Sequence, residues 1–283
     1  MRILVTGTSG QLGAAIAADL AGDHEVIGVD LVAGTHTTLR GSITDRVFVF
    51  SLMEGMDAVV HTASLHAPHV PSHARSDFVA INVQGTLNLL EAAAKHGARR
   101  FVYSSTMSLY GTAMVPQERA VWVTETLLPQ PRDIYDLTKI AAEHCCAVIS
   151  QKTDLSCLSL RLSRFFTEPL ETMAIYRLYR GVDVRDVATA HRLALHADMP
   201  GYDVFNISAQ PPFSQDETEA LLHDARAVLL RHFPALETTF ARRRWTLPAS
   251  IDRVYVIDKA TRRLGYRPRF DFEAFMNEIG VSE

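Results

Sequence analysis

Apolar positions along this chain of 283 residues follow two alternating patterns. Short apolar runs, such as 57–61 and 100–104, are typical of strands that are buried on both faces. Longer segments, such as 77–96 and 135–151, carry apolar residues every three or four positions, as on one face of a helix. Because strands and helices alternate, the pattern predicts a parallel sheet that is covered by helices on both sides.

The predicted elements can be placed along the chain by their boundaries. Strands are expected at 3–5, 25–29, 39–40, 57–61, 100–104, 155–162 and 202–207. Helices are expected at 14–20, 46–54, 77–96, 135–151, 215–232 and 259–264. Gly97 and Gly265 suit the ends of two helices, because glycine readily adopts the left-handed backbone of a helix C-terminus. A loop interrupted by prolines is expected at 111–134.

Three glycines join the first strand to the first helix. Gly7 permits a tight turn, Gly10 lets a pyrophosphate approach the main chain, and Gly13 lets the helix lie close to the sheet. The helix N-terminus offers unpaired N–H groups to phosphates. The second strand ends in Asp30, where an acid can accept hydrogen bonds from an adenosine ribose. This context favours a dinucleotide site over an ordinary strand, turn and helix.

These observations predict an α/β fold of the Rossmann type, in which a doubly wound parallel sheet carries a small, shortened C-terminal substrate lobe. The dinucleotide-binding domain is expected to span 1–162 and to include 182–208. The lobe is expected to comprise 163–181 and 209–283.

Composition narrows the classes of partner. A net charge of −4 gives no reason to expect nucleic acid or an anionic membrane, and the short basic run at 242–244 is typical of a solvated surface. The three cysteines, Cys145, Cys146 and Cys157, form no disulfide framework. No apolar run is long enough to cross a bilayer, and Met1 directly precedes the first strand, which leaves no room for a signal peptide. A cytoplasmic location is therefore expected.

A loop rich in histidine and proline follows the buried strand 57–61. The strand ends before Ala63, at the edge of the sheet where the cofactor is expected. His66 and His69 lie in the loop and are candidate substrate contacts. No metal is expected, because no Cys or carboxylate lies at ligand spacing from these histidines.

Tyr135 and Lys139 are four positions apart, which places both side chains on one face of a helix. A phenol is a poor base at its ordinary pKa near 10. A neighbouring ammonium favours the phenolate, so Lys139 is expected to lower the pKa of Tyr135 and make it a general base toward an alcohol. Thr106, at the end of a strand, could bond the same substrate oxygen. An isolated pair of this kind is commonly a surface contact, but here it accompanies a dinucleotide motif.

The chain resembles the extended short-chain dehydrogenase/reductase superfamily, in its NAD-dependent epimerase/dehydratase group. The motifs that carry the resemblance are residues 6–13, 30, 57–61, 82–86, 103–106, 110–111, 135–139, 160–161, 184–187 and 264–268. They follow one another in the expected order over nearly the whole chain.

The resemblance implies a role for each matching residue. Tyr135 is the base, Lys139 lowers its pKa and holds the nicotinamide ribose, and Thr106 orients the reacting hydroxyl. Asp30 selects NAD over NADP, and Asn82 braces a helix against a strand. The residues expected to bind NAD are Gly7, Ser9, Gly10, Gln11, Leu12, Gly13, Asp30, Ala63, Tyr135 and Lys139.

The chain departs from the family pattern at two places: the position that contacts adenine and the length of the substrate lobe. Ser42 stands where relatives commonly have an Asp that touches adenine, and the segment after Arg161 is shorter than in relatives that handle nucleotide sugars. A short lobe with arginines resembles compact hexuronate dehydrogenases, and arginine suits bidentate recognition of a carboxylate or phosphate. The candidate substrate residues are His66, Met107, Ser108, Arg164, Arg177 and Arg180, although any one arginine could equally be a solvated or interface residue.

The resemblance implies an NAD-dependent oxidoreductase that transfers hydride at a hydroxyl carbon of a sugar or sugar-acid-like small molecule. One alternative is a nucleotide-sugar epimerase or dehydratase with transient hydride transfer, in which Glu125 could supply an acid. Another is a catalytically idle protein that binds NAD as a regulatory ligand. Relatives commonly dimerise through four helices, so helices 77–96 and 135–151 are expected to form a homodimer interface.

Overall fold

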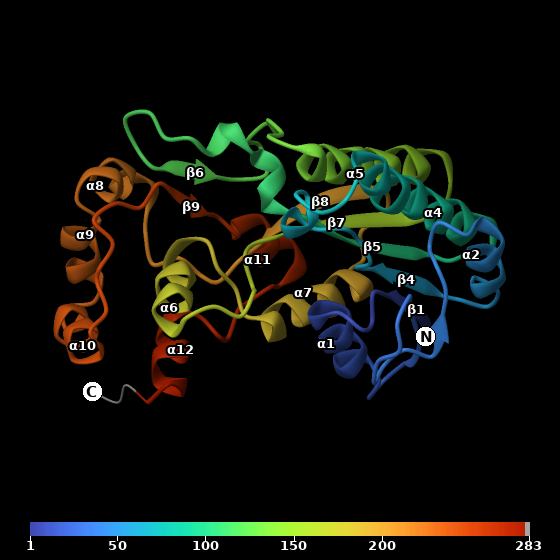
Figure 1. The fold of residues 1–283 in the computed structure, drawn as a ribbon, viewed down its shortest axis with the longest axis horizontal. Helices are drawn as coiled ribbons and strands as arrows, with labels where there is room; N and C mark the ends of the chain where they lie inside the picture. Colours follow the sequence, from blue (N-terminus) through green and yellow to red (C-terminus); the bar gives the residue numbers. More distant parts are fainter. Residues whose placement is uncertain (281–283) are drawn as a thin grey trace.

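The structure, a computed structural model, describes residues 1–280. Its centre is a seven-stranded, all-parallel sheet in the order β3-β2-β1-β4-β5-β7-β8 (Figure 1). The strands are β1 Arg2–Thr6, β2 Glu25–Asp30, β3 Leu39–Arg40, β4 Ala58–His61, β5 Arg100–Thr106, β7 Ser156–Leu162 and β8 Tyr202–Ile207. The strand order reverses between β1 and β4, which confirms the predicted doubly wound sheet.

Helices cover both faces of this sheet (Figure 1). One face carries α1 Gln11–Leu20, α7 Val184–His196 and α11 Asp258–Leu264, and the other carries α2 Arg46–Leu52, α4 Thr86–Lys95 and α5 Ile134–Lys152. Each face has its own apolar core, in which side chains that alternate along β1 and β4 point to opposite sides. Both cores are needed to bury strands that are apolar on both faces.

The predicted helix 77–96 is one continuous helical run with an irregular middle. It comprises α3 Arg75–Phe78, a π-helical segment Val79–Gly85 and α4. Within the π segment, the Asn82 side chain accepts from the Leu65 N–H at 2.8 Å and donates to the Leu65 carbonyl at 3.0 Å. It also donates to the Thr138 hydroxyl at 3.1 Å. Asn82 therefore ties the loop after β4 to this helix and to α5.

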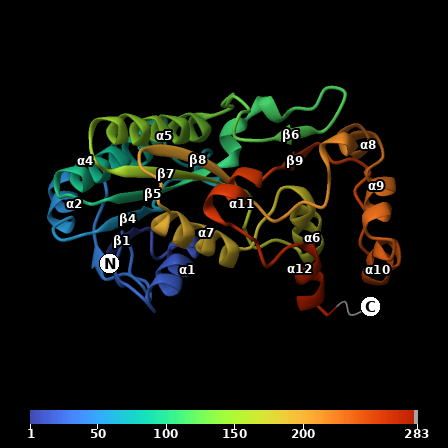
Figure 2. The same ribbon diagram turned by 180° about the vertical axis from the view of Figure 1, so that it is seen from behind.

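The second part of the molecule is a lobe of short helices beside the carboxyl edge of the sheet (Figure 2). Its helices are α6 Leu170–Tyr179, α8 Thr218–His223, α9 Ala225–His232, α10 Leu236–Arg243 and α12 Phe272–Glu278. The expected single helix 215–232 is wrong, because the chain breaks at Asp224, where φ is −150°. The Asp224 carboxylate accepts from the Ala227 N–H at 3.1 Å and so starts α9.

Two segments cross the predicted domain boundary. Strand β6 Val121–Val123, expected as loop in the first domain, pairs in parallel with β9 Arg253–Tyr255 in the lobe. Residues 257–266, expected in the lobe, instead pack against β8 and α7 in the core of the main sheet. Both differences arise because these segments contact parts of the chain that are distant in sequence.

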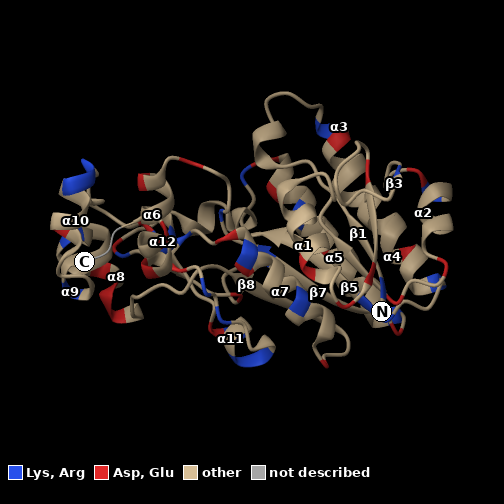
Figure 3. Ribbon diagram, turned by 90° about the horizontal axis from the view of Figure 1, so that it is seen from below, with Lys and Arg blue, Asp and Glu red and all other residues tan. Residues whose placement is uncertain are grey.

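Charged residues of both signs are interspersed over the ribbon (Figure 3). No helix within residues 1–280 is both long and apolar enough to span a membrane.

Candidate active site

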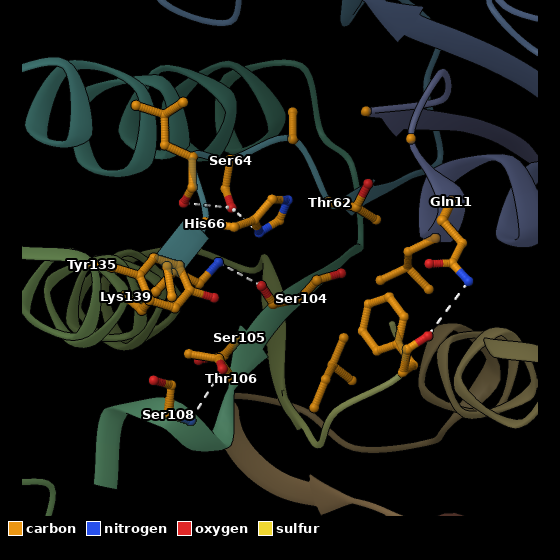
Figure 4. Close-up of a pocket in the computed structure, with 18 of the residues that line it drawn as sticks. Gln11, Thr62, Ser64, His66, Ser104, Ser105, Thr106, Ser108, Tyr135 and Lys139 are labelled. Carbon is orange, nitrogen blue, oxygen red and sulfur yellow. Dashed lines mark hydrogen bonds between the residues drawn. The ribbon is translucent and has the colours of Figure 1, made fainter. Parts of the chain in front are cut away.

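A cavity of about 590 Å³ opens at the carboxyl ends of β1, β2, β4, β5 and β7, between the sheet and the lobe. This is the edge at which open α/β sheets bind ligands. Side chains from the glycine loop, the loop after β4, the end of β5 and the start of α5 face this space (Figure 4).

The glycine loop forms one wall of the cavity. Gly7 has a φ of +77°, a conformation that favours glycine. A Cβ on Gly13 would lie 2.0 Å from the Gly7 carbonyl oxygen, so only glycine lets α1 begin this close to the turn. No side chain caps the N-terminus of α1, which leaves its first N–H groups available for phosphate oxygens. The loop therefore fits a dinucleotide pyrophosphate, as the sequence predicts.

Asp30 lies beside this loop at the end of β2. Its carboxylate accepts from the Ser9 N–H at 3.0 Å and from the Val32 N–H at 3.2 Å. These bonds fix the orientation of the carboxylate on the cavity wall, where it could accept from ribose hydroxyls. Ser9 itself does not line the cavity, since its hydroxyl donates to the Val32 carbonyl at 2.8 Å. Ser42 does line this end of the cavity.

Thr106, Tyr135 and Lys139 meet on the opposite wall (Figure 4). Tyr135 lies in the first turn of α5, which starts where the Asp133 carboxylate accepts from the Asp136 N–H at 3.0 Å. Lys139 follows one turn later, and its Nζ donates to the Ser104 carbonyl at 2.7 Å. The structure therefore brings together the three side chains that the sequence predicts for proton transfer.

The expected electrostatic effect of Lys139 on Tyr135 is not found in this structure. Burial raises the pKa of Tyr135 to about 12, and hydrogen bonding with Thr106 opposes this only in part. Burial also lowers the pKa of Lys139 to about 7, although the Glu143 carboxylate opposes the change. In the protein alone, the pKa of Tyr135 shifts in the direction opposite to the expectation, because loss of hydration and the nearby carboxylates of Asp136 and Asp133 disfavour the phenolate.

His66 projects into the cavity from the loop after β4 (Figure 4). Its ring meets the Tyr135 ring edge to face, with centroids 6.4 Å apart. Burial, followed by the charges of Lys139 and His69, lowers the pKa of His66 to about 4, so the imidazole is neutral at pH 7. His69 does not line the cavity; its Nδ1 accepts from the His66 N–H at 2.9 Å and supports the loop.

The other predicted substrate residues divide into two groups. Met107, Ser108, Arg164 and Arg180 line the cavity. Arg177 does not, because it is buried in the lobe, where it pairs with Asp183 at 2.8 Å and donates to the Phe270 carbonyl. Arg177 therefore lies away from the substrate space, and its role in the structure is to join α6 to the segment before α12.

Several residues of the cavity wall were not predicted from sequence. Arg253 and Tyr255 reach it from β9, and Met114 lies beside them. No local signal marks them, because the pairing of β6 with β9 joins segments more than 120 residues apart. Arg132 was also missed, although its spacing of four from Asp136, with which it pairs at 3.1 Å, was visible in the sequence.

Glu125, the candidate acid for dehydration, does not line the cavity. Its carboxylate accepts from the Asn206 N–H at 2.8 Å, and burial raises its pKa. The structure therefore gives Glu125 a supporting role between the lobe and β8. Within residues 1–280, no three His, Cys, Asp or Glu side chains converge in a way that could hold a metal ion.

Comparison with curated proteins finds relatives of several activities. The chain is 32% identical over 206 residues to the uncharacterized UDP-glucose epimerase YtcB of Bacillus subtilis, covering 64% of this chain and 62% of that protein. It is 26% identical over 176 residues to uronate dehydrogenase of Pseudomonas putida, covering 59% and 62%. These matches thus span about three fifths of the relatives' lengths.

Solved structures agree with the fold. A short-chain dehydrogenase/reductase superfamily protein from Agrobacterium tumefaciens with bound NAD has a TM-score of 0.74 and 22% identity, covering 98% of this chain and 95% of that chain. A mutated uronate dehydrogenase has a TM-score of 0.70 and 22% identity, covering 100% and 88%. At this level of identity the likeness shows the fold alone.

Residues 3–180 match the family described as the NAD dependent epimerase/dehydratase family. The match includes the glycine loop, Asp30, Thr106, Tyr135 and Lys139, and it confirms the family and the NAD cofactor predicted from the motifs. The chain belongs to the NAD-dependent epimerase/dehydratase family.

Proposed function

We propose that the protein is an NAD-dependent oxidoreductase that acts at a hydroxyl carbon of a sugar or sugar acid. One observation carries the proposal: Thr106, Tyr135 and Lys139 share a cavity with a glycine loop and Asp30. A dinucleotide with its pyrophosphate at the glycine loop and one ribose at Asp30 would extend toward Tyr135. The proposal extends to this chain the chemistry of its family.

The chain's own residues would position and deprotonate the alcohol. Thr106 and Tyr135 both present hydroxyls to the same space, so a substrate hydroxyl could bond to both. Tyr135 would accept the hydroxyl proton as the carbon loses its hydride. When bound, NAD supplies the hydride acceptor and a positively charged ring near the phenol. Added positive charge favours the phenolate, which would offset the raised pKa of Tyr135.

Lys139 would contribute in its charged form. Because the pKa of Lys139 is about 7, its ammonium and amine forms interconvert close to neutral pH. Its Nζ already bonds to the Ser104 carbonyl at 2.7 Å, and two further N–H donors remain for a ribose hydroxyl.

A nucleotide-sugar epimerase is the second candidate, since a relative at 32% identity bears the name UDP-glucose epimerase. Dehydration is less favoured. Elimination of water needs a proton donor at the leaving oxygen, and Asp30 is the one Asp or Glu that lines the cavity within residues 1–280. Asp30 lies at the adenosine end, away from Tyr135.

The test is to mix purified protein with NAD and a panel of aldoses, uronic acids and UDP-sugars, and to record NADH absorbance while products are analysed. Stoichiometric NADH supports the oxidoreductase. A changed sugar without NADH would favour the epimerase. If NAD binds and no compound changes, the remaining alternative is an idle protein that uses NAD as a regulatory ligand.

We also propose that the protein is a homodimer. Apolar side chains at Leu137 and Val148 on α5 are 52% and 46% exposed, and Val79 beside them is 48% exposed. Leu137, Ala141 and Val148 lie on one side of α5, away from the sheet, and Val79 is exposed at the start of the neighbouring π-helical segment. A second copy could bury them in a four-helix interface. Light scattering should give a dimer mass that Leu137→Glu reduces to a monomer; a monomeric wild type would refute the interface.

A cytoplasmic location is proposed as well. The three cysteines are free thiols, as expected in a reducing compartment. Cell fractionation with an antibody against the protein would test it, and recovery in an oxidising compartment would refute it.

A further inference from the structure

Arg180 differs from the other arginines of the cavity wall in its lack of an acidic partner. Arg132 pairs with Asp136, Arg164 with Glu168, and Arg253 with Asp252. Within residues 1–280, no carboxylate lies within ion-pair distance of Arg180. Its positive charge at the cavity wall is therefore not neutralised by the protein.

Aromatic rings hold the Arg180 guanidinium at the end of α6. The guanidinium carbon lies 4.2 Å from the centre of the Tyr176 ring and 5.7 Å from that of Tyr179. Because its aliphatic stem continues from the C-terminus of α6, the main chain also fixes the residue: its N–H donates to the Tyr176 carbonyl at 2.8 Å. The N–H donors of Arg180 thus remain free for a ligand in the cavity.

Arg253 approaches the same region from β9. Its Nη1 lies 3.3 Å from the Met114 Sδ, and the Tyr255 hydroxyl lies 3.5 Å from the same sulfur. Arg180 and Arg253 each lower the pKa values of Tyr179 and Tyr255, against the raising effect of burial. Helix α6 packs against β9, and Arg180 and Arg253 both line the cavity, so two guanidinium groups from separate elements converge at its lobe end.

The charged side chains at the lobe end of the cavity have a net charge that favours a ligand with one negative charge. Arg253 is neutralised by Asp252, whereas Arg180 contributes one uncompensated positive charge. Arg180 is partly buried, and a ligand that covers it without supplying a negative charge would remove its water and leave it unpaired, which is costly. A single negative charge would complete the site, whereas a diphosphate would bring an excess of negative charge and a neutral sugar would leave the arginine unpaired.

We infer that the substrate carries one carboxylate, bound by the guanidinium of Arg180 with Arg253 and the Tyr255 hydroxyl beside it. Arginine pairs well with the planar, two-oxygen geometry of a carboxylate. This inference rests on the proposed function, because it places the carboxylate end of a sugar acid opposite the hydroxyl that Tyr135 deprotonates.

The first test measures binding without turnover, by the melting temperature of the NAD-free protein. The probes are D-galacturonate, D-glucuronate, neutral D-galactose and doubly charged D-galactose 1-phosphate. The uronates should raise the melting temperature, because a ligand that binds only the folded state stabilises it. Galactose should not. A larger shift with galactose 1-phosphate, or no shift with either uronate, would overturn the inference.

Two variants assign the effect to the arginine. Arg180→Gln should weaken uronate binding about tenfold or more, as expected when a charge-assisted hydrogen-bonded pair is lost. Arg242→Gln, on the exposed surface of α10, should leave it unchanged. Arg180→Lys keeps the positive charge but lacks the planar, bidentate N–H donors of a guanidinium. It should bind uronate more tightly than Arg180→Gln and less tightly than the wild type. Equal uronate binding by wild type and Arg180→Gln would refute the assignment, provided that both proteins melt cooperatively.

Kinetics separates this inference from the proposed function. With NAD present, the ratio of kcat/KM for D-galacturonate to that for D-galactose should exceed tenfold in the wild type and collapse in Arg180→Gln. NADH formation from neutral sugars without a preference for acids would leave the oxidoreductase standing and refute the carboxylate. Uronate binding without any NADH formation would refute the oxidoreductase and leave the carboxylate inference standing.

Discussion

The ammonium of Lys139 lies 4.3 Å from the centre of the Tyr103 ring. Lys139 is only 2% exposed, and Glu143, one turn later on α5, pairs with Arg161 at 2.7 Å. The electron-rich ring face and the Ser104 carbonyl are therefore the groups that directly contact the buried ammonium. Tyr103 is a positioning residue for Lys139, although it does not line the cavity itself.

Removing this ring should change how activity depends on pH. In Tyr103→Leu the ammonium loses a cation–π interaction of about 0.5–2 kcal/mol, which corresponds to a further decrease in the pKa of Lys139 of about 0.4–1.5. Since the charged form supports Tyr135, the alkaline limb of the kcat/KM profile should move to lower pH. A pH series of initial rates measures this.

Tyr103→Phe is the matched control. It keeps the ring, and the Tyr103 hydroxyl that it removes is buried without a hydrogen-bond partner. The alkaline limb should stay in place, and the free energy of unfolding should be unchanged or slightly higher. Equal displacement of the limb in both variants would contradict a role for the ring.

Tyr135→Phe should remove the proton acceptor while leaving the cavity intact. We expect kcat to fall by about 10²–10⁴, which is the usual contribution of general acid–base catalysis. The dissociation constant of NAD, measured by quenching of protein fluorescence, should change little. Retained turnover would show that another group accepts the proton.

Asp30 should determine the choice between NAD and NADP. Its carboxylate would repel a 2′-phosphate while accepting from the ribose hydroxyls of NAD. Asp30→Asn keeps an oxygen that can accept from the Ser9 N–H, so the loop should survive the change. The ratio of the dissociation constants for NADP and NAD should fall about tenfold or more, and an unchanged ratio would refute this role.

Two buried histidines should make the fold sensitive to acid. His61 bonds to the Thr6 and Thr86 hydroxyls, and His191 bonds to the Ser104 hydroxyl at 2.8 Å and to the Val187 carbonyl. Burial lowers the pKa of His61 to about 3 and that of His191 to about 4.

Below pH 6.5 the unfolded chain takes up protons at these histidines and the folded chain does not, so stability falls as pH falls. Each fully buried histidine contributes a slope that approaches roughly 1.4 kcal/mol per pH unit between pH 6 and 5. Urea unfolding at several pH values measures the slope. His191→Gln should reduce it, whereas His73→Gln, at an exposed position, should not.

Local sequence was enough to predict residues that the structure brings together around the cavity. Backbone turns, strand ends and helical spacing, which are short-range properties, place Gly7, Gly13, Asp30 and the Tyr135–Lys139 pair there. The parallel sheet with helices on both faces followed from the alternation of elements, because parallel strands need crossover connections. The missed residues, Arg253 and Tyr255, depend on β6 pairing with β9, a contact that no short window contains.

The sequence by itself thus determined the family, the doubly wound sheet and the NAD cofactor. Only the tertiary structure decided which arginine faces the cavity, since Arg177 and Arg180 are three residues apart and packing of α6 buries the first and exposes the second to the cavity. It also decided the directions in which the pKa values of Tyr135 and Lys139 shift. The energy of a charge depends on how much water the surrounding side chains exclude, and that exclusion exists only once distant segments have packed together.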